Sequence, residues 1–330
     1  LSRFQRSPAM VAKRPSASSA HPAADVLIVG SLNMDLVIRT PRLPRPGQTV
    51  AAPALETIPG GKGANQAVAA ARLGARVAML GCVGDDAYGT ALRDGLRREG
   101  VDTSMVSEHA GVATGIACVT VANSGQNTIV IVAGANELLT PTMIEAQRAA
   151  FERARVIVCQ LESPPDAVEC ALKLGQRLGK TVILNPAPAI GPLPTPWIAA
   201  CDYLIPNETE AALLTARPVD SPEAALDAAA DLHAQGARHV IVTLGAHGVA
   251  YVDAHSRLLM PAPTAHAIDT TAAGDTFVGA LAAALAEDAA ADAAIEFGQA
   301  AAAVSVTRLG AQPSIPFRSE LGAPAAPATH

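Results

Sequence analysis

One stretch near the C-terminus carries residues that could transfer a charged group. It reads Ile268-Asp-Thr-Thr-Ala-Ala-Gly-Asp-Thr-Phe-Val-Gly-Ala-Leu281, a small-residue turn that opens into a helix-like run with Asp275 in its first turn. The free backbone N–H groups of Ala272, Ala273 and Gly274 would bind an anion there, strengthened by the helix dipole. An aspartate that only caps the helix gives the same pattern, so both interpretations stay open at this point.

A second stretch could hold a polar ligand close to the main chain. It reads Pro59-Gly-Gly-Lys-Gly-Ala-Asn-Gln66, with three glycines beside a lysine and an asparagine at a predicted helix start. Glycines allow a ligand to approach the backbone closely. The stretch is neither a GxxxxGK[ST] phosphate loop nor a GxGxxG fingerprint, which would need a glycine where Gln66 stands. Alone, it is equally well explained as a tight turn.

Polar side chains also follow several predicted strands at the point where each strand ends. In open α/β sheets ligands bind at the carboxyl ends of the strands, so these side chains are expected to meet at one edge. A single residue of this kind is usually a helix cap, but their number in one chain favours a binding site. They are Asn33 with Asp35, Glu162, Asn185, Asn207 with Glu210, and Thr243 with Gly245.

Alternating strand-like and helix-like segments must position these residues. Short apolar runs typical of buried parallel strands alternate with amphipathic or Ala-rich segments. Repeated β-then-α units predict an α/β fold with a mainly parallel central sheet and helices on both faces. The expected strands are 26–30, 77–80, 156–161, 181–184, 203–205 and 239–244. The expected helices are 64–73, 87–99, 166–178, 208–215, 222–235, 273–287 and 290–308.

Two segments, 33–59 and 113–132, interrupt this alternation. The first holds two extended stretches around a proline-rich turn, and the second reads as a hairpin of residues 114–121 and 128–132. The hairpin is apolar on both faces, with Ile116 and Cys118 on one and Val119 and Val121 on the other. Such a sheet must cover both faces. We expect one face to close over a ligand as a lid and the other to meet a second subunit in a homodimer.

The composition excludes several classes of protein. The chain has 330 residues, 50% of them hydrophobic, 16% charged and 3% aromatic, and a formal charge of −6. These values argue against a disordered polyelectrolyte and against a nucleic-acid-binding protein. No apolar run approaches the roughly 18 residues of a membrane span. The five cysteines show no CxxC spacing and the histidines no metal-binding spacing, which predicts reduced thiols in the cytoplasm and no structural zinc.

The termini differ from the rest of the chain. Residues 1–24 hold Arg3, Arg6, Lys13 and Arg14 and no acid, without the apolar region of a secretory signal. A loose tail is favoured over a weak transit peptide, and Met10 could be the true start. We expect a single domain over 25–318 and a second tail over 319–330.

Short motifs along residues 25–318 resemble those of the PfkB-type carbohydrate kinases, the ribokinase family. The DTxAAGD string is shared by many sugar and nucleoside kinases, whereas GGKGANQ, AGAN and GAQPS resemble the family's ribose-phosphorylating members more closely. The matching strings are Gly30-Ser-Leu-Asn-Met-Asp35, Gly60-Gly-Lys-Gly-Ala-Asn-Gln66, Ala133-Gly-Ala-Asn136, Leu161-Glu-Ser-Pro164, Asn185-Pro-Ala-Pro188, Pro206-Asn-Glu-Thr-Glu210, Thr243-Leu-Gly-Ala-His-Gly248, Asp269-Thr-Thr-Ala-Ala-Gly-Asp275 and Val306-Thr-Arg-Leu-Gly-Ala-Gln-Pro-Ser314.

The resemblance implies a three-layer α/β/α ribokinase-like fold with a small β-sheet lid. It implies ATP-dependent phosphorylation of D-ribose at the 5-hydroxyl, giving D-ribose 5-phosphate and ADP, with Mg²⁺ required and K⁺ activating. Asp275 would be the general base, and the amides of residues 272–274 would form the anion hole. Positioning and charge neutralisation supply most of the acceleration in such a transfer.

The resemblance also assigns binding residues by position. The sugar would be bound by Asn33, Asp35, Gly61, Lys62, Gly63, Asn65, Glu162 and Asp275. ATP would be bordered by Asn207, Thr243, Gly245, Gly248, Gly274 and Gln299, the last at a position where the family often has His or Asn. K⁺ would be held, mostly through main-chain oxygens, by Asp269, Thr271, Ser305, Arg308, Gly310 and Ser314. Glu210 would help to hold Mg²⁺ through water, as this ion prefers. Lys62 would also reach the phosphates, unless it is a solvated surface lysine.

Another PfkB-type sugar kinase or a nucleoside kinase is the alternative function. A nucleoside acceptor would favour aromatic side chains in the lid, and neither 33–59 nor 113–132 contains Phe, Tyr or Trp. Kinases of fructose or keto-deoxy-gluconate stay open, because a hexose and a pentose differ by one hydroxymethyl group. A catalytically silent binding protein should have lost the aspartate or the anion-binding turn, and both are present.

Overall fold

The computed structural model describes residues 24–124, 126–189 and 191–322. Almost all of the predicted N-terminal tail and most of the predicted C-terminal tail lie outside these ranges. Among the described residues past 318, Glu320 forms an ion pair with Arg308, and Leu321 packs against α9 and α10. The packed part of the chain therefore extends at least to Leu321.

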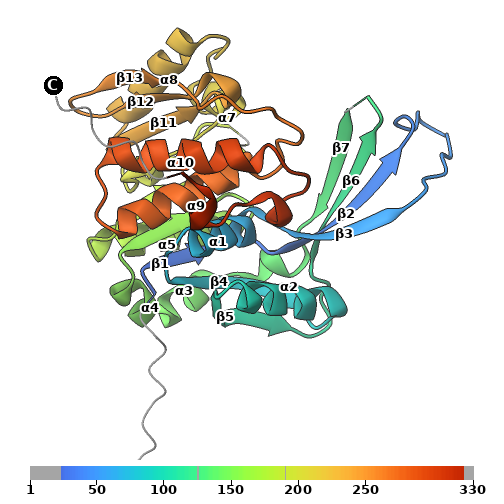
Figure 1. Cartoon of the computed structure of the whole chain (residues 1–330). Helices are drawn as coiled ribbons and strands as arrows, with labels where there is room; N and C mark the ends of the chain where they lie inside the picture. The colour runs from blue at the N-terminus through green and yellow to red at the C-terminus, as the bar shows by residue number, and fades with distance from the viewer. Residues whose placement is uncertain (1–23, 125, 190, 323–330) are drawn as a thin grey trace, which may run out of the picture.

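A nine-stranded sheet forms the centre of the described chain, in the order β13-β12-β11-β10-β9-β8-β1-β4-β5 (Figure 1). All neighbours from β11 to β5 are parallel, which confirms the predicted α/β architecture. Two antiparallel strands, β12 and β13, extend one edge. The strands are β1 (Val26–Val29), β4 (Val77–Gly84), β5 (Asp102–His109), β8 (Val156–Cys159), β9 (Thr181–Leu184), β10 (Tyr203–Leu204), β11 (His239–Thr243), β12 (Val249–Val252) and β13 (Arg257–Met260).

Helices cover both faces of this sheet and enclose one apolar core on each side. One face carries α1 (Lys62–Arg72), α2 (Ala87–Arg98), α9 (Ala273–Ala286) and α10 (Ala291–Ser305). The other carries α3 (Pro141–Ala146), α4 (Arg148–Arg153), α5 (Pro165–Arg177), α6 (Thr195–Ile198), α7 (Glu208–Thr215) and α8 (Pro222–Ala234). Short 3₁₀ turns are η1 (Gly134–Leu138), η2 (Gly245–His247), η3 (Gln312–Ser314) and η4 (Arg318–Glu320).

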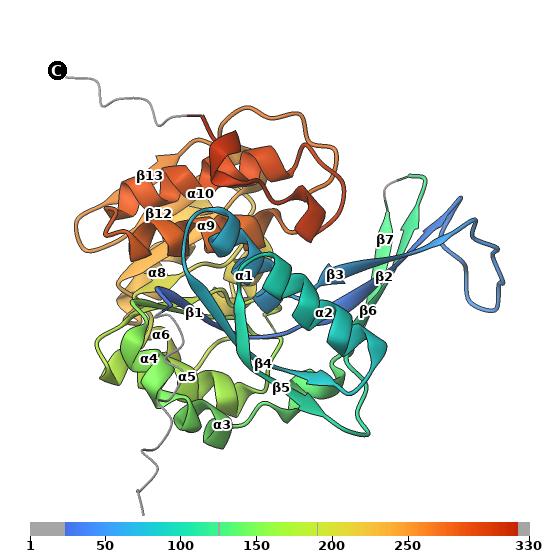
Figure 2. The same ribbon diagram turned by 60° about the horizontal axis from the view of Figure 1, so that its bottom comes forward.

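A second, four-stranded sheet projects from this body, as Figures 1 and 2 both show. We call it the lid sheet: β3 (Leu55–Gly60), β2 (Asn33–Thr40), β6 (Gly115–Ala122) and β7 (Asn127–Val132), in that order. The predicted hairpin is confirmed as the antiparallel pair β6–β7, while β2 and β6 run parallel. Because β2 begins four residues after β1 ends, the lid sheet is rooted at the carboxyl edge of the main sheet.

Within the described ranges, no helix combines the length and apolar character needed to cross a bilayer. All five cysteines are free thiols. Complete burial raises the pKa of Cys159 to about 12, so this thiol is not a reactive one.

Candidate active site

The carboxyl ends of the parallel strands lie along one edge of the sheet, and the predicted site residues gather there. Glu162 follows β8, Asn185 follows β9 directly, and Asn207 follows β10. The side chain of Gln66, in α1, bonds to both Asn185 and Asp275, so α1 and α9 begin at the same edge. Helix N-termini and strand ends together make a place where an anionic ligand is stabilised.

Asp275 is buried in the first turn of α9, and both of its carboxylate oxygens accept hydrogen bonds from α1. Asn65 Nδ2 donates to Oδ2 at 2.9 Å, and Gln66 Nε2 donates to Oδ1 at 3.0 Å. Ala272 occupies the N-cap position, and no described side chain caps the helix. The interpretation of Asp275 as a helix cap is therefore wrong.

The turn before α9 is strained and partly open. Ala272 has a left-handed φ of 59°, a conformation that residues other than glycine rarely adopt. Gly274 is exposed, with no atom within 4 Å of the position of a Cβ. The prediction that the Ala273 amide is free is wrong, because the turn closes on itself and this N–H donates to the Thr270 carbonyl at 3.2 Å. Ala272 and Gly274 supply the two remaining amides of the predicted anion hole.

Two glycines let the start of α1 lie directly against the segment that follows β1. Gly61 has a φ of 88°, and a Cβ on it would lie 2.7 Å from the backbone nitrogen of Asn33. A Cβ on Gly63 would lie 2.7 Å from the backbone nitrogen of Ser31. Only glycine permits both approaches, so these two positions serve the packing of the site as well as any ligand.

Glu162 joins three segments of the site. Its Oε2 accepts hydrogen bonds from Ser31 Oγ at 2.6 Å, from the Lys62 backbone N–H at 3.1 Å and from Asn33 Nδ2 at 3.4 Å. Ser31 was not among the predicted residues, although it stands in the Gly30–Asp35 motif. Such a carboxylate fixes the loop after β1 relative to the start of α1.

Asn136, which the sequence placed only in a motif, anchors the first residue of the lid sheet. Its Nδ2 donates to Asn33 Oδ1 at 2.8 Å and to the Leu32 carbonyl at 3.1 Å, and its Oδ1 accepts from the Leu32 N–H at 2.9 Å. The side chain of Asn33 is thereby held between Asn136 and Glu162.

The charges of the site are concentrated around Lys62. Burial alone would lower the pKa of this lysine, but nearby carboxylates outweigh it and raise the pKa. They are Asp275, Glu162 and Glu210. Lys62 is therefore not a solvated surface lysine. For Asp35, burial first and then the charges of Glu162 and Asp275 raise the pKa to about 7.

The residues predicted to border ATP lie farther along the same edge. Asn207 and Glu210 form a capping box at the start of α7, in which each bonds the other's backbone N–H. Asn207 also forms an isolated parallel bridge with Thr243. Burial raises the pKa of Glu210, although the Asn207 N–H and Lys62 act in the opposite direction. Gln299 Nε2 donates to the Met260 carbonyl at 3.0 Å, beside the end of β13.

Of the residues predicted to hold a monovalent cation, Asp269 bonds Thr271 and Gly310, whereas the hydroxyls of Ser305 and Ser314 donate to the nearby carbonyls of Ala302 and Ala311. Asp269 Oδ1 accepts from the N–H and the Oγ1 of Thr271, and its Oδ2 accepts from the Gly310 N–H at 2.9 Å. Arg308 directs its guanidinium to Glu320, so only its main chain is available to a cation. Within the described ranges, no cluster of three or more His, Cys, Asp or Glu side chains is suited to a metal ion.

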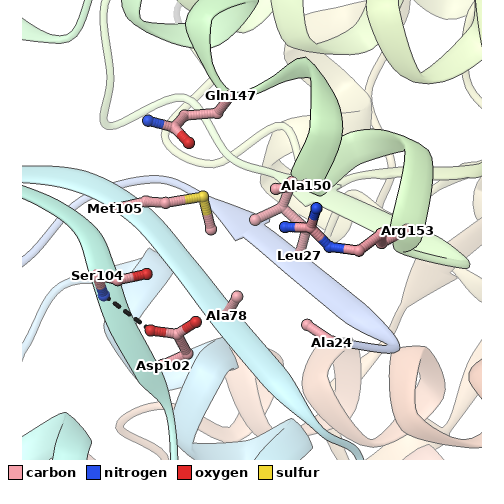
Figure 3. A pocket seen from close by; sticks show the side chains of 9 residues that line it. All are labelled: Ala24, Leu27, Ala78, Asp102, Ser104, Met105, Gln147, Ala150 and Arg153. Carbon is pink, nitrogen blue, oxygen red and sulfur yellow. Dashed lines mark hydrogen bonds between the residues drawn. The ribbon is translucent and has the colours of Figure 1, made fainter. Parts of the chain in front are cut away.

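Two cavities lie outside this group of residues. One of about 160 Å³ sits between the β1–β4–β5 part of the sheet and α4, with Asp102 and Arg153 on its walls (Figure 3). It contains none of the predicted site residues. The other, of about 440 Å³, lies between residues 263–266 and α10 and is lined mainly by small side chains, including Ala300, Ala303 and Val304.

Comparison with known proteins gives consistent matches over most of the chain. The family model described as pfkB family carbohydrate kinase matches residues 23–318. A ribokinase of Haemophilus influenzae is 42% identical over 293 residues, covering 89% of this chain and 95% of that protein. A deoxyribokinase of Salmonella typhi is 37% identical over 292 residues, covering 88% and 95%. The structure of Arabidopsis thaliana ribokinase complexed with ribose and ATP superposes with a TM-score of 0.85 at 34% identity, covering 91% of this chain and 98% of that one.

Proposed function

Because this chain belongs to the pfkB family of carbohydrate kinases and is a phosphotransferase of the ribokinase type, we propose that its acceptor is D-ribose. The γ-phosphoryl group of ATP would pass to the 5-hydroxyl, giving D-ribose 5-phosphate and ADP. The observation that carries this proposal is the convergence of sugar-binding side chains on Asp275. Asn65 bonds it directly, and Asp35 lies close enough for the Asp275 charge to raise its pKa.

The chemistry at Asp275 follows from its position. Its carboxylate takes the proton of the sugar hydroxyl while the hydroxyl oxygen attacks the γ-phosphorus. The new O–P bond forms as the bond to the β-phosphate oxygen breaks, and ADP leaves. The amides of Ala272 and Gly274, at the N-terminus of α9, face the charge that develops on the phosphoryl oxygens. Lys62 adds a positive charge, because three neighbouring carboxylates raise the pKa of its amine and keep it protonated.

The sugar hydroxyls require several fixed polar partners, and Asn33, Asp35 and Glu162 supply them. Asn33 and Glu162 are bonded to each other and to Ser31 or Asn136, so their orientations are set before a sugar arrives. The lid strands contain no aromatic side chain that could stack on a purine, which favours a bare sugar over a nucleoside.

ATP would lie along the Asn207–Thr243 part of the edge, with its base toward Gln299 on α10. Glu210 fits a water-mediated contact to Mg²⁺, because its Oε2 is held by the Asn207 N–H and a single carboxylate with substrate phosphates suffices for this ion. Mg²⁺ bound to the phosphates would neutralise their charge. K⁺ would lie by the Asp269 carboxylate and the main chain of 305–314, next to the anion hole, and fix its shape.

A homodimer through the lid sheet completes the proposal. The large apolar side chains on β7 are between 48% and 64% exposed, with Val130 the most exposed of them, and Leu55 on β3 is 57% exposed. Apolar side chains grouped on one small sheet favour a protein–protein contact.

The deciding experiment is a coupled ADP-release assay with Mg·ATP and K⁺ on D-ribose, 2-deoxyribose, fructose and adenosine. We expect ribose-dependent turnover well above that of the other three, and none when EDTA exceeds Mg²⁺. The Asp275→Asn variant should fold normally and lose at least about 100-fold in kcat. Faster turnover of another acceptor would contradict D-ribose as the substrate. Near-normal turnover by Asp275→Asn would exclude Asp275 as the base.

A further inference from the structure

A chain of buried side-chain amides leads away from the Asp275 carboxylate through Gln66. Its centre is Gln66, whose side chain is completely buried. Gln66 Nε2 donates to Asp275 Oδ1 at 3.0 Å and to Asn185 Oδ1 at 3.1 Å. Gln66 Oε1 accepts from Gln160 Nε2 at 2.6 Å. The ends of β8 and β9 and the first turns of α1 and α9 thus meet at one amide group.

Neighbours determine the orientations of Asn185 and Gln66, whereas Gln160 Oε1 has no hydrogen-bond partner among the described residues, so Gln160 is oriented only by its bond to Gln66. Asn185 Nδ2 donates to the Ile205 main-chain carbonyl at 2.8 Å, so its Oδ1 must face Gln66. Gln160 presents its Nε2 to Gln66, so the Gln66 oxygen must face Gln160. A flipped Gln66 amide would set its oxygen against two other oxygens, those of Asp275 and Asn185. Gln66 can therefore only donate to Asp275.

Asn65 and Gln66 each donate a hydrogen bond to a different oxygen of the Asp275 carboxylate. Asn65 bonds Oδ2 and is slightly exposed, at 6%, whereas Gln66 bonds Oδ1 and is 0% exposed. One N–H on each oxygen fixes the rotation of the carboxylate group and leaves lone pairs for a sugar hydroxyl. Because Gln66 is sealed from solvent, it has no contact with sugar or nucleotide.

We propose that Gln66 is a positioning residue that holds the Asp275 carboxylate in the orientation needed to take the hydroxyl proton, with Gln160 and Asn185 fixing Gln66 in turn. This inference rests on the proposed function, since it assigns a role relative to the base. Buried amides also need partners for stability alone. The two roles differ in one respect: a positioning role acts only through Asp275, whereas a structural role does not depend on it.

A double-mutant cycle separates the two roles. Gln66→Met keeps the size and removes every hydrogen bond, and we expect it to lower kcat with Mg·ATP and ribose about 10- to 100-fold, with the KM for ATP within about twofold. In an Asp275→Asn background, the same substitution should cost less than about twofold in kcat, because there is no base left to orient. An equal loss in both backgrounds, or no loss in either, would overturn the proposal.

Controls keep the test independent of folding and of the proposed base. Thr103→Val removes another buried side-chain partner, that of Arg97 beside β5, and should leave kcat unchanged. If thermal unfolding shows that Gln66→Met does not fold, Gln160→Met takes its place, since it frees the Gln66 amide without touching Asp275. It should show a smaller loss of the same kind. A fully active Asp275→Asn would instead refute the proposed base, which is a separate result.

Discussion

Among single residues, Asp35 has a carboxyl group whose pKa lies well above its value in water. Burial and the nearby charges of Glu162 and Asp275 raise its pKa from 3.8 to about 7. A ligand-free site that crowds three carboxylates is destabilised whenever all of them are ionised. A sugar whose hydroxyls donate to these groups would offset part of that repulsion, so the free-energy cost would be greatest in the ligand-free protein.

The pH dependence of stability should report this cost. The folded protein binds the Asp35 proton more tightly than the unfolded chain does. The contribution of Asp35 to the free energy of unfolding is therefore greatest below about pH 4 and falls as the pH rises to about 7. Over this pH range, the free energy of unfolding should fall by up to about 4 kcal/mol. Thermal unfolding without ligand should therefore show Asp35→Asn gaining several degrees on the wild type between pH 5 and pH 8.

Asp227→Asn, on the exposed face of α8, provides the control for that comparison, since Asp227 pairs only with Arg257 at the surface. Its difference from the wild type should not change over the same pH range. A constant difference for Asp35→Asn as well would mean that Asp35 is already ionised in the folded protein at pH 5.

At the scale of elements, the proposed cation site is formed by two loops that are far apart in the sequence. Residues 268–271 are bonded to residues 306–310 through backbone hydrogen bonds and Asp269. The same short segment continues into the turn at 272–274, where the Ala272 and Gly274 amides are proposed to bind the phosphate. A cation bound by Asp269 would therefore affect the geometry of these amides directly.

Replacing K⁺ by Na⁺ at constant ionic strength should consequently lower kcat several-fold in the ADP-release assay. The smaller ion cannot contact all of the main-chain oxygens without moving the loop. Tetramethylammonium chloride is the control for ionic strength. Equal rates in K⁺, Na⁺ and tetramethylammonium would remove the cation site from the proposal.

The elements that sequence could predict are those with a one-dimensional pattern. β1, β8 and β9 are continuous apolar runs because helices cover both faces, and their positions are confirmed. β5 and β13 lie at the edges of the sheet and carry polar or exposed residues, so no run marks them. The site divides in the same way. Asp275 and Lys62 stand in local motifs, whereas the roles of Ser31 and Gln66 depend on bonds to residues 131 and 94 to 209 positions away.

Over the described part of the molecule, the lid sheet carries a group of large apolar side chains that the rest of the chain does not cover. Its base packs against the body through Leu36 and Ile116, but β7 leaves a row of apolar side chains exposed. A monomer would expose this row to water permanently. A second lid sheet, packed against one face of the first, would cover Val130 and Val132, which alternate with Ile129 and Ile131 on the opposite face.

We expect the wild type to sediment as a dimer at micromolar concentration and Val130→Asp to sediment as a monomer. An aspartate in an apolar interface costs several kcal/mol, enough to dissociate a contact of modest size. Leu258→Asp is the matched control, because Leu258 is 50% exposed on β13, away from the lid sheet. A wild-type monomer, or dissociation by both variants alike, would contradict the lid interface.

The chain places part of the proposed sugar-binding site in the lid sheet and the proposed catalytic residues in the body. Asn33 and Asp35 lie in β2, within the lid sheet, while Asp275 and its amide support belong to the rigid body. A tilt of the lid sheet would thus shift two of the residues proposed to bind the sugar and would leave the proposed base and anion hole in place. Under the proposed function, acceptor choice would be divided between Asn33 and Asp35 in the lid sheet and Asn65 and Glu162 in the body, whereas the phosphoryl chemistry would lie in the body alone, so changes in β2 could alter specificity without rebuilding the turn before α9.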